Sequence, residues 1–234
     1  MWPFAKKYPL EALLQGWTDW HSHILPGVDD GVRTLDESLQ ALAYYEEKGV
    51  KQVWLTPHIM TEEANTTERL KERYKKLQAA YNGPVQLHLA AENMLDRLFG
   101  ERLEEGDLLT LPEDCLLVET SYLNPPIDFW EILHRIRVKG YWPVLAHPER
   151  YVYMGEKDYR RLRKEDVQLQ LNLPSLAGLY GPAVQKKAVW MLKNGFYGRS
   201  GSDLHRPGVT RTAFEKASVK KGILDLAQEL VSVL

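Results

Sequence analysis

Short runs of β-branched, aromatic and aliphatic residues alternate along this chain with longer segments whose apolar residues recur at a helical period. This alternation is typical of repeated βα units around a parallel sheet. It predicts seven strands, at residues 17–21, 52–56, 85–90, 115–119, 142–146, 167–171 and 197–200. It predicts helices at residues 35–48, 66–81, 127–139, 159–163, 182–194 and 212–234. Thr34 and Glu37 have the spacing of a capping box at the start of the first helix.

Several of the predicted strands are apolar on both faces. Helices covering the outside of a closed parallel barrel, with side chains filling its inside, produce this pattern, and an open doubly wound sheet gives a similar one. The chain has neither a Pro-, Gly- or Ser-rich linker nor an internal repeat, so we predict a single α/β domain. We expect an N-terminal arm at residues 1–16 and a distorted TIM-like barrel of seven βα units at residues 17–234.

Charge and cysteine content limit the partners that this chain can have. Thirty Lys and Arg residues against 32 Asp and Glu residues give a net charge of −2, so no global attraction for nucleic acid or anionic lipid exists. The single cysteine, Cys115, excludes an internal disulfide and a thiolate zinc cluster, which is typical of a reducing compartment. We find no signal-peptide pattern and no stretch of apolar residues long enough for a membrane span, and therefore predict a cytoplasmic protein.

Side chains that bind metals occur at the carboxyl ends of six of the seven predicted strands. The first strand ends in a His-x-His pair, whose imidazoles point to the same side because side chains alternate in extended backbone. Strand ends and the loops after them meet on one face of an α/β barrel, so we expect these side chains to surround a single centre. The candidate ligands are His21, His23, Asp30, His58, Glu92, Glu119, His147, Asp203 and His205.

Mixed nitrogen and oxygen ligands in this number are typical of a multinuclear hydrolytic site for Mn, Fe or Zn. Nine donors exceed the needs of one ion, and with a bridging carboxylate they suffice for two or three. Such a centre stabilises both the attacking and the leaving oxygen in a displacement at phosphorus. Any one of these residues alone is more simply a structural residue, and His88 and His134 fall outside the predicted face.

Arginines follow two of the candidate ligands. Arg150 lies three residues after His147, Arg206 follows the last candidate histidine directly, and Arg211 comes slightly later. The planar guanidinium suits phosphate oxygens and would stabilise charge in a transition state, whereas the alternative for each is an ordinary surface arginine. Cys115 is expected in the core, because the Cys-x5-Arg loop of thiol-dependent phosphatases is absent.

These motifs resemble those of a known superfamily. The run Asp19-Trp-His-Ser-His-Ile-Leu-Pro-Gly-Val-Asp-Asp-Gly31 is similar to the opening motif of the PHP (polymerase and histidinol phosphatase) metallohydrolases. The similarity is to their CpsB/YwqE-type branch, the manganese-dependent bacterial protein-tyrosine phosphatases of capsule and exopolysaccharide synthesis. Further motifs follow in the family's order: Thr56-Pro-His58, Ala91-Glu92, Val118-Glu119, Ala146-His-Pro-Glu-Arg150-Tyr151 and Gly201-Ser-Asp203-Leu-His205.

The resemblance implies a (β/α)7 PHP fold and three sets of metal ligands, with manganese the favoured ion. The implied sets are His21, His23, Glu92 and Asp203; Glu92, as a bridge, with Glu119 and His147; and Asp30, His58 and His205. Carboxylates at positions 30 and 119 resemble the tyrosine-phosphatase branch, since small-molecule phosphatases of the superfamily tend to have histidine there. Arg150 matches the family's phosphate-binding arginine, and Arg206 or Arg211 is expected to take the second arginine role.

The implied activity is hydrolysis of phosphotyrosine in a protein by a metal-bridging hydroxide. Arg150 and Arg206 would hold the phosphate, and Asp203 or His205 would pass a proton to the leaving oxygen, although a phenolate leaves with little help. The resemblance implies the tyrosine-rich tail of a membrane tyrosine autokinase as substrate. Three loop tyrosines are candidates for flanking the substrate ring, or are simply exposed: Tyr122, Tyr151 and Tyr153.

Three other functions remain open from the sequence. The same metals would serve a histidinol-phosphate or other small-molecule phosphatase. Comparing the turnover of a phosphotyrosine peptide with that of histidinol phosphate distinguishes this function from the protein-tyrosine phosphatase. A metal-dependent nuclease or polymerase proofreading module is disfavoured by the near-neutral charge. A binding module with a vestigial metal site is disfavoured because all nine ligand positions hold residues that bind metals.

Overall fold

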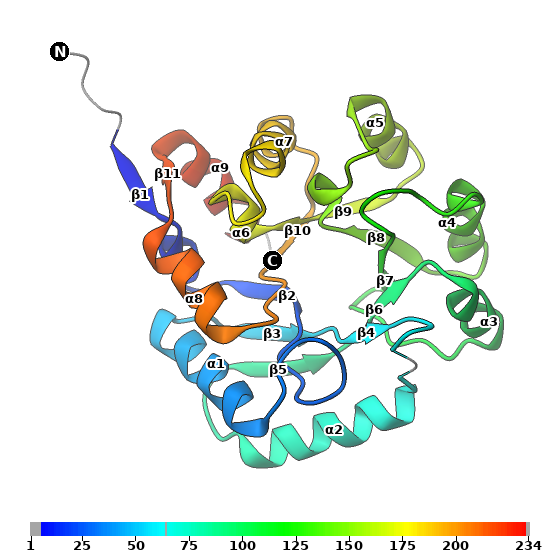
Figure 1. Ribbon diagram of the computed structural model, residues 1–234, viewed down its shortest axis with the longest axis horizontal. Helices are drawn as coiled ribbons and strands as arrows, with labels where there is room; N and C mark the ends of the chain where they lie inside the picture. Colours follow the sequence, from blue (N-terminus) through cyan, green and yellow to red (C-terminus); the bar gives the residue numbers. More distant parts are fainter. Residues whose placement is uncertain (1–5, 64, 233–234) are drawn as a thin grey trace.

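The computed structural model describes residues 6–63 and 65–232, whose parallel strands form a curled sheet with helices around its outside (Figure 1). Each of the seven predicted runs overlaps an observed strand, with bounds that differ by at most two residues. These strands are β2 (Thr18–Ser22), β3 (Gln52–Leu55), β5 (Gln86–Leu89), β7 (Cys115–Glu119), β8 (Trp142–Ala146), β9 (Gln168–Asn172) and β10 (Arg199–Gly201). Two short strands, β4 (His58–Ile59) and β6 (Glu92–Met94), continue β3 and β5 after two-residue breaks.

The hydrogen-bonded ladders divide these parallel strands into two sheets. One has the order β10-β9-β8-β7-β6-β4 and the other β2-β3-β5. The gap between β10 and β2 is crossed by a bridge between Ser22 and Leu204 and by a bond from the amide of Asp203 to the carbonyl of His21 at 2.8 Å. A mixed α/β domain is therefore confirmed, but the ladders of the described residues do not form one closed seven-stranded barrel.

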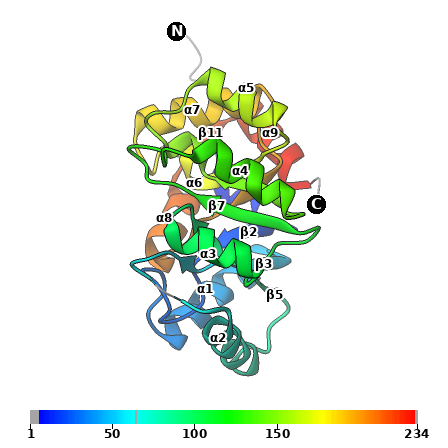
Figure 2. The ribbon, with the colours of Figure 1, turned by 90° about the vertical axis from the view of Figure 1, so that its right-hand side faces the viewer.

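Helices cover the outer face of the curled sheet, and in side view β7 runs between α4 above and α3 below (Figure 2). The helices are α1 (Leu35–Lys48), α2 (Thr67–Ala80), α3 (Arg97–Glu105), α4 (Phe129–Val138), α5 (Glu156–Lys164), α6 (Leu173–Leu176), α7 (Pro182–Lys193), α8 (Pro207–Lys216) and α9 (Lys221–Ser232). The predicted capping box is present, since Thr34 Oγ1 accepts from the amide of Glu37 and the Glu37 carboxylate accepts from that of Thr34. Among the described residues, no helix is both long enough and apolar enough to cross a bilayer.

Two features of the helical pattern differ from the prediction. Helix α3 and the short α6 were not predicted, and the single helix expected from residue 212 onward is α8 and α9 separated by strand β11 (Ser218–Lys220). The interruption arises because β11 pairs antiparallel with β1 (Lys7–Pro9), a long-range contact that helical periodicity does not register. Beyond β1, a 3-10 helix at Leu10–Leu13 buries both of its leucines. Residues 1–5 of the predicted N-terminal arm lie outside the described residues.

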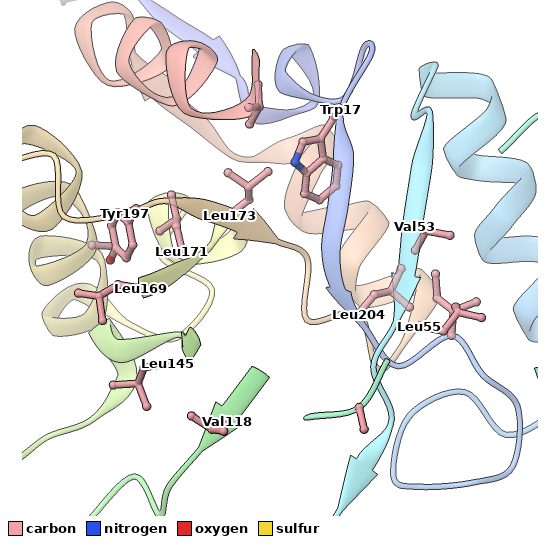
Figure 3. Packing of buried hydrophobic residues seen from close by; sticks show 14 of the residues in the cluster. Trp17, Val53, Leu55, Val118, Leu145, Leu169, Leu171, Leu173, Tyr197 and Leu204 are labelled. Carbon is pink, nitrogen blue, oxygen red and sulfur yellow. The ribbon is translucent and has the colours of Figure 1, made fainter. Parts of the chain in front are cut away.

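The two faces of the strands contribute to two separate apolar clusters. On β7, Leu116 and Val118 belong to the large cluster beneath the helices, whereas Cys115 and Leu117 belong to a smaller cluster inside the curled sheet. Figure 3 shows part of the large cluster, including Val118. This alternation explains why the strands are apolar on both faces, and it makes Cys115 a buried core residue, as predicted.

Candidate metal centre

The carboxyl ends of the strands bring the predicted ligands together. His21 and His23 lie at the end of β2, His58 begins β4, Glu92 begins β6 and Glu119 ends β7. The remaining candidates come from the loops that follow β2, β8 and β10: Asp30, His147, Asp203 and His205. The polar atoms of eight of the nine fall into three overlapping groups, within each of which all ligand atoms lie within 4.8 Å of one another.

The first group is His21, His23, Glu92 and Asp203, the same four residues that the resemblance implies for one ion. Glu92 Oε2 lies 3.1 Å from His21 Nε2 and 3.2 Å from His23 Nε2. Asp203 Oδ1 lies 3.6 and 3.5 Å from the same two nitrogens. All four side chains are buried, so together they form a compact set of two nitrogen and two oxygen donors.

The other two groups share His58, whose two ring nitrogens face opposite ways. Its Nδ1 lies 3.2 Å from Glu92 and 3.0 Å from Glu119, and its Nε2 lies 3.6 Å from Asp30. The resemblance implies His147, rather than His58, beside the two glutamates. In the structure His147 Nε2 lies 3.0 Å from Glu92 Oε1 and 3.9 Å from Glu119 Oε2, at the edge of that group.

The third group joins Asp30, His58 and His205 and adds His23. His205 Nε2 lies 3.2 Å from Asp30 Oδ1. Asp30 is 67% exposed at its side chain, so this end of the centre opens to solvent while the Glu92 end is closed. The nine candidates thus form one continuous cluster that runs from the interior to the surface.

Glu92 provides the test of whether these residues fit a cation. Its Oε2 atom is buried and, among the described residues, lacks a partner with hydrogen-bond geometry, although three imidazoles lie within 3.2 Å of it. Among the same residues, His58 Nδ1 is also buried and also lacks a partner with hydrogen-bond geometry. Lone pairs that converge without pairing are what a shared cation satisfies, and the mixed imidazole and carboxylate set suits a divalent ion.

The electrostatics of the cluster also favour a cation. Burial acts to raise the pKa of Glu92, but the charges of His21 and His58 outweigh it and hold that pKa well below its usual range. Burial and the nearby charge of Glu92 raise the pKa of Glu119. Burial acts to lower the pKa of His58, but the charge of Glu92 overcomes it and raises that pKa to about 10. The carboxylates therefore create a negative potential that draws positive charge to the centre.

Two residues outside the predicted set orient the histidines of the His-x-His pair. Asp29 Oδ2 accepts from His23 Nδ1 at 2.8 Å and from the amide of His58 at 3.0 Å. Gln170 Oε1 lies 2.9 Å from His21 Nδ1. Both contacts direct Nε2 of each ring toward Glu92, as outer partners of metal-binding histidines do. Two features of the sequence could have indicated these residues: a second carboxylate beside Asp30 and a glutamine in an apolar strand.

The backbone is held in unusual conformations next to the centre. His147 and Asp203 have φ angles of 34° and 53°, in the left-handed region that is costly for residues other than glycine. Asp19, fully buried on β2, accepts from the amide and hydroxyl of Ser202 at 2.8 and 2.6 Å and from Tyr45 at 2.5 Å. These bonds tie β2 to the residue before Asp203 and so help to fix that ligand.

Two glycines allow loops to pack against the His-x-His pair. A Cβ atom on Gly31 would lie 2.4 Å from His23 Cβ, and one on Gly201 would lie 2.5 Å from His21 Cβ. Both separations are shorter than a van der Waals contact, so any side chain at these positions would displace a candidate ligand.

A cavity of about 410 Å³ opens onto the centre. It is lined by Asp30, His58, Tyr122, Arg150, Leu179, Tyr180, Asp203, His205, Arg206, Val209 and Thr210. Both predicted arginines, Arg150 and Arg206, therefore line the cavity. Arg150 also donates to Asp203 Oδ2 at 2.5 Å. Arg211 instead pairs with Glu215 at 2.8 Å and does not line this cavity.

Of the three loop tyrosines predicted to flank a substrate ring, the cavity lining includes Tyr122. Tyr151 is buried beneath it, and its hydroxyl accepts from the amide of Thr120 at 3.3 Å. Tyr153 stacks against Tyr151 with ring centroids 5.7 Å apart. These two tyrosines are therefore packing residues of the loop rather than part of the cavity lining.

Histidines and carboxylates gathered at the carboxyl ends of parallel strands define an α/β protein of the metallohydrolase class. The chain belongs to the capsular polysaccharide synthesis family CpsB/CapC, whose model matches residues 17–221.

Among curated proteins, it is 26% identical over 198 residues to the tyrosine-protein phosphatase YwqE of Bacillus subtilis (strain 168), covering 80% of this chain and 76% of that one. It is 28% identical over 228 residues to the tyrosine-protein phosphatase CpsB of Streptococcus pneumoniae, covering 87% of this chain and 90% of that one.

The fold is shared with a solved structure of this group. The crystal structures described as those of YwqE from Bacillus subtilis and CpsB from Streptococcus pneumoniae, unique metal-dependent tyrosine phosphatases, include a chain that matches with a TM-score of 0.77. That match has 22% sequence identity and covers 93% of both chains. The shared architecture extends over almost the whole domain.

Proposed function

We propose that this chain is a metal-dependent phosphatase that hydrolyses phosphotyrosine in proteins. The observation that carries the proposal is the convergence of the histidine and carboxylate cluster with Arg150 on a single cavity. Membership of the CpsB/CapC family, with relatives named tyrosine-protein phosphatases, supports phosphotyrosine as the substrate class.

The residues that would hold the ions are the nine candidate ligands in their three implied sets, with Glu92 shared between the first two. We propose two or three divalent ions, with manganese favoured over iron or zinc. Bound there, they supply Lewis-acid activation of water and of the phosphate oxygens. Asp29 and Gln170 keep the imidazoles turned toward these ions.

The protein's own groups bind and orient the phosphate. Arg150 and Arg206 present guanidinium groups to the cavity and would neutralise the phosphate oxygens opposite the ions. Of the two proposed proton donors to the leaving oxygen, His205 is 26% exposed at its side chain and Asp203 only 3%. Asp203 Oδ2 is also occupied by Arg150, so we favour His205 for this role.

The proposal is tested by comparing two substrates on the purified protein supplied with Mn²⁺. We expect kcat/KM for a phosphotyrosine peptide to exceed that for histidinol phosphate by at least about tenfold, which is about 1.4 kcal/mol of transition-state binding. The opposite preference would show that the small-molecule alternative is correct. Absence of hydrolysis of either substrate, in protein with full metal content, would reject phosphatase function altogether.

We further propose the tyrosine-rich tail of a membrane tyrosine autokinase of polysaccharide export as the substrate, in the cytoplasm. The family description, capsular polysaccharide synthesis, supports this setting. We also propose that the seven principal strands act as the units of one distorted barrel. Strands β3 and β5 belong to one sheet, and their continuations β4 and β6 belong to the other, so the chain itself links the two sheets. This continuity supports that description.

Replacing Asp29 with alanine is expected to weaken metal binding about tenfold to a hundredfold, because His23 and His58 lose the acceptor that orients them. Competition between the protein and a fluorescent chelator for Mn²⁺ measures the change. Asp36→Ala, at an exposed position in the first turn of α1, is the control. Equal affinities of the two variants would contradict a role for Asp29.

A further inference from the structure

The side chain of Arg150 is flanked by two tyrosine rings. Its guanidinium carbon lies 4.3 Å from the ring centroid of Tyr122 and 4.3 Å from that of Tyr180. Tyr122 comes from the loop after β7 and Tyr180 from the segment between α6 and α7, while Arg150 follows β8. Three segments distant in sequence therefore meet around one cation at the mouth of the cavity.

Both rings are held by contacts of their own. The hydroxyl of Tyr180 accepts from Asn172 Nδ2 at 3.1 Å and lies 3.4 Å from Asp203 Oδ2. The carbonyl of Tyr122 accepts from the amide of Val152 at 3.0 Å, which ties its loop to the one that carries Arg150. The ring of Tyr122 also stacks on that of Tyr151, with centroids 6.0 Å apart, so each tyrosine has a contact besides Arg150.

Ring contacts of this kind determine which part of a guanidinium remains available to hydrogen-bond acceptors. Aromatic faces attract the flat faces of the group and shield them, so its N–H edge is what it presents to polar partners. One edge nitrogen of Arg150 already donates to Asp203 Oδ2 at 2.5 Å. Asn172 Nδ2 donates to the same oxygen at 2.9 Å, so Asp203 is itself fixed.

Arg206, the second arginine of the cavity, lacks these restraints. It is exposed, and within the described ranges it has neither an ion pair nor a ring contact of this type. An unrestrained arginine loses rotamer freedom when it binds an anion, whereas Arg150 has already lost it. The two arginines of the cavity thus differ in preorganisation rather than in charge.

We propose that Tyr122 and Tyr180 are positioning residues that hold the N–H edge of Arg150 toward the phosphate of the substrate. This inference rests on the proposed function, because it assumes that the cavity receives a phosphoryl group. It assigns the two tyrosines to the arginine and not to the ring of the substrate. The phenyl ring is the part that matters at both positions.

The experiment compares phenylalanine with leucine at each position. Tyr122→Phe and Tyr180→Phe keep an aromatic face, whereas Tyr122→Leu and Tyr180→Leu keep apolar bulk and remove it. We expect each leucine variant to raise the Kd of inorganic phosphate for the Mn²⁺-loaded protein between about threefold and about thirtyfold, and each phenylalanine variant to restore most of the affinity. Isothermal titration calorimetry measures this binding without any turnover.

Steady-state kinetics with a phosphotyrosine peptide supply a second readout. Arg150→Lys keeps the charge but not the planar edge, and we expect Tyr180→Leu to cost much less in that background than in the wild type. Tyr141→Leu, which removes a half-buried tyrosine at the other end of β8, is the control for general loss of packing. Metal content and thermal midpoint are measured for every variant, and the half-exposed Tyr122 keeps the comparison usable if a Tyr180 variant does not fold.

Three outcomes would overturn the inference: leucine variants that bind phosphate like the wild type, phenylalanine variants as weak as the leucine variants, or a wild-type protein that binds no phosphate. Failure of the proposed function is a separate result. A wild-type protein that binds phosphate but hydrolyses no phosphotyrosine would reject the function, while the ranking of phosphate affinities would still decide the role of the two tyrosines.

Discussion

Replacing Glu92 with glutamine is expected to lower kcat/KM for a phosphotyrosine peptide by about a thousandfold or more, or about 4 kcal/mol of transition-state stabilisation. The two oxygens of this carboxylate lie within 3.2 Å of four imidazoles, those of His21, His23, His58 and His147. Glutamine keeps the shape of the side chain but removes the charge and one acceptor oxygen, so the shared position between two proposed ions is lost.

Elemental analysis of the same variant separates loss of metal from loss of chemistry. We expect fewer ions per chain than in the wild type, because Glu92 belongs to two of the three ligand groups. Glu101→Gln is the matched control, since Glu101 is 53% exposed on α3 and pairs with Arg97. A Glu92→Gln variant that retained more than about a tenth of the wild-type activity would show that this carboxylate does not bridge catalytic ions.

Removing the metals is expected to abolish activity and to lower the thermal midpoint of unfolding. Glu92, Glu119 and Asp203 are buried carboxylates placed close together, and cations that bind them only in the folded state stabilise that state. At a free ion concentration a hundred times the Kd, one site contributes about 2.7 kcal/mol. Dialysis against a chelator followed by differential scanning calorimetry, with and without added Mn²⁺, measures the shift.

Restoring the ions one kind at a time tests the proposed preference for manganese. We expect Mn²⁺ to restore the most activity, with Fe²⁺ and Zn²⁺ restoring less. The His21→Ala variant should recover little activity and gain little stability, because it lacks a ligand of the most buried group. Full activity after exhaustive chelation would reject a metal-dependent mechanism.

The predicted strands and the predicted ligands share one physical origin. Buried parallel strands need continuous apolar runs, so polar residues occur where each strand ends, and the sequence exposes both the runs and their ends. For the same reason the nine candidate ligands were expected around one centre, whereas the grouping of His21, His23, Glu92 and Asp203 was implied by the family resemblance and is present in the structure. Helices α8 and α9 were merged in the prediction because pairing between β1 and β11 is not a local property.

The sequence offered signals for the residues that orient the centre, but not the contacts that these residues make. Nothing in the Asp29-Asp30 pair indicates which carboxylate faces outward to His205 and which turns back to His23. Gln170 contacts His21 across 149 positions of the chain, and Tyr180 reaches Arg150 from a segment with no recognised motif. Both contacts join segments that are distant in sequence and come close in space only when the chain folds.

Periodicity and residue chemistry are local properties, so they were enough to predict the class of fold, the types of ligand and the face on which the ligands lie. The folded structure was needed to show that the strands divide into two sheets and that His58 rather than His147 lies in the group with Glu92 and Glu119. It was also needed to show that Arg150 lies over the rings of two tyrosines, Tyr122 and Tyr180. These features depend on the curvature of the sheet and on side-chain directions at loop ends, which arise only when all the elements pack together.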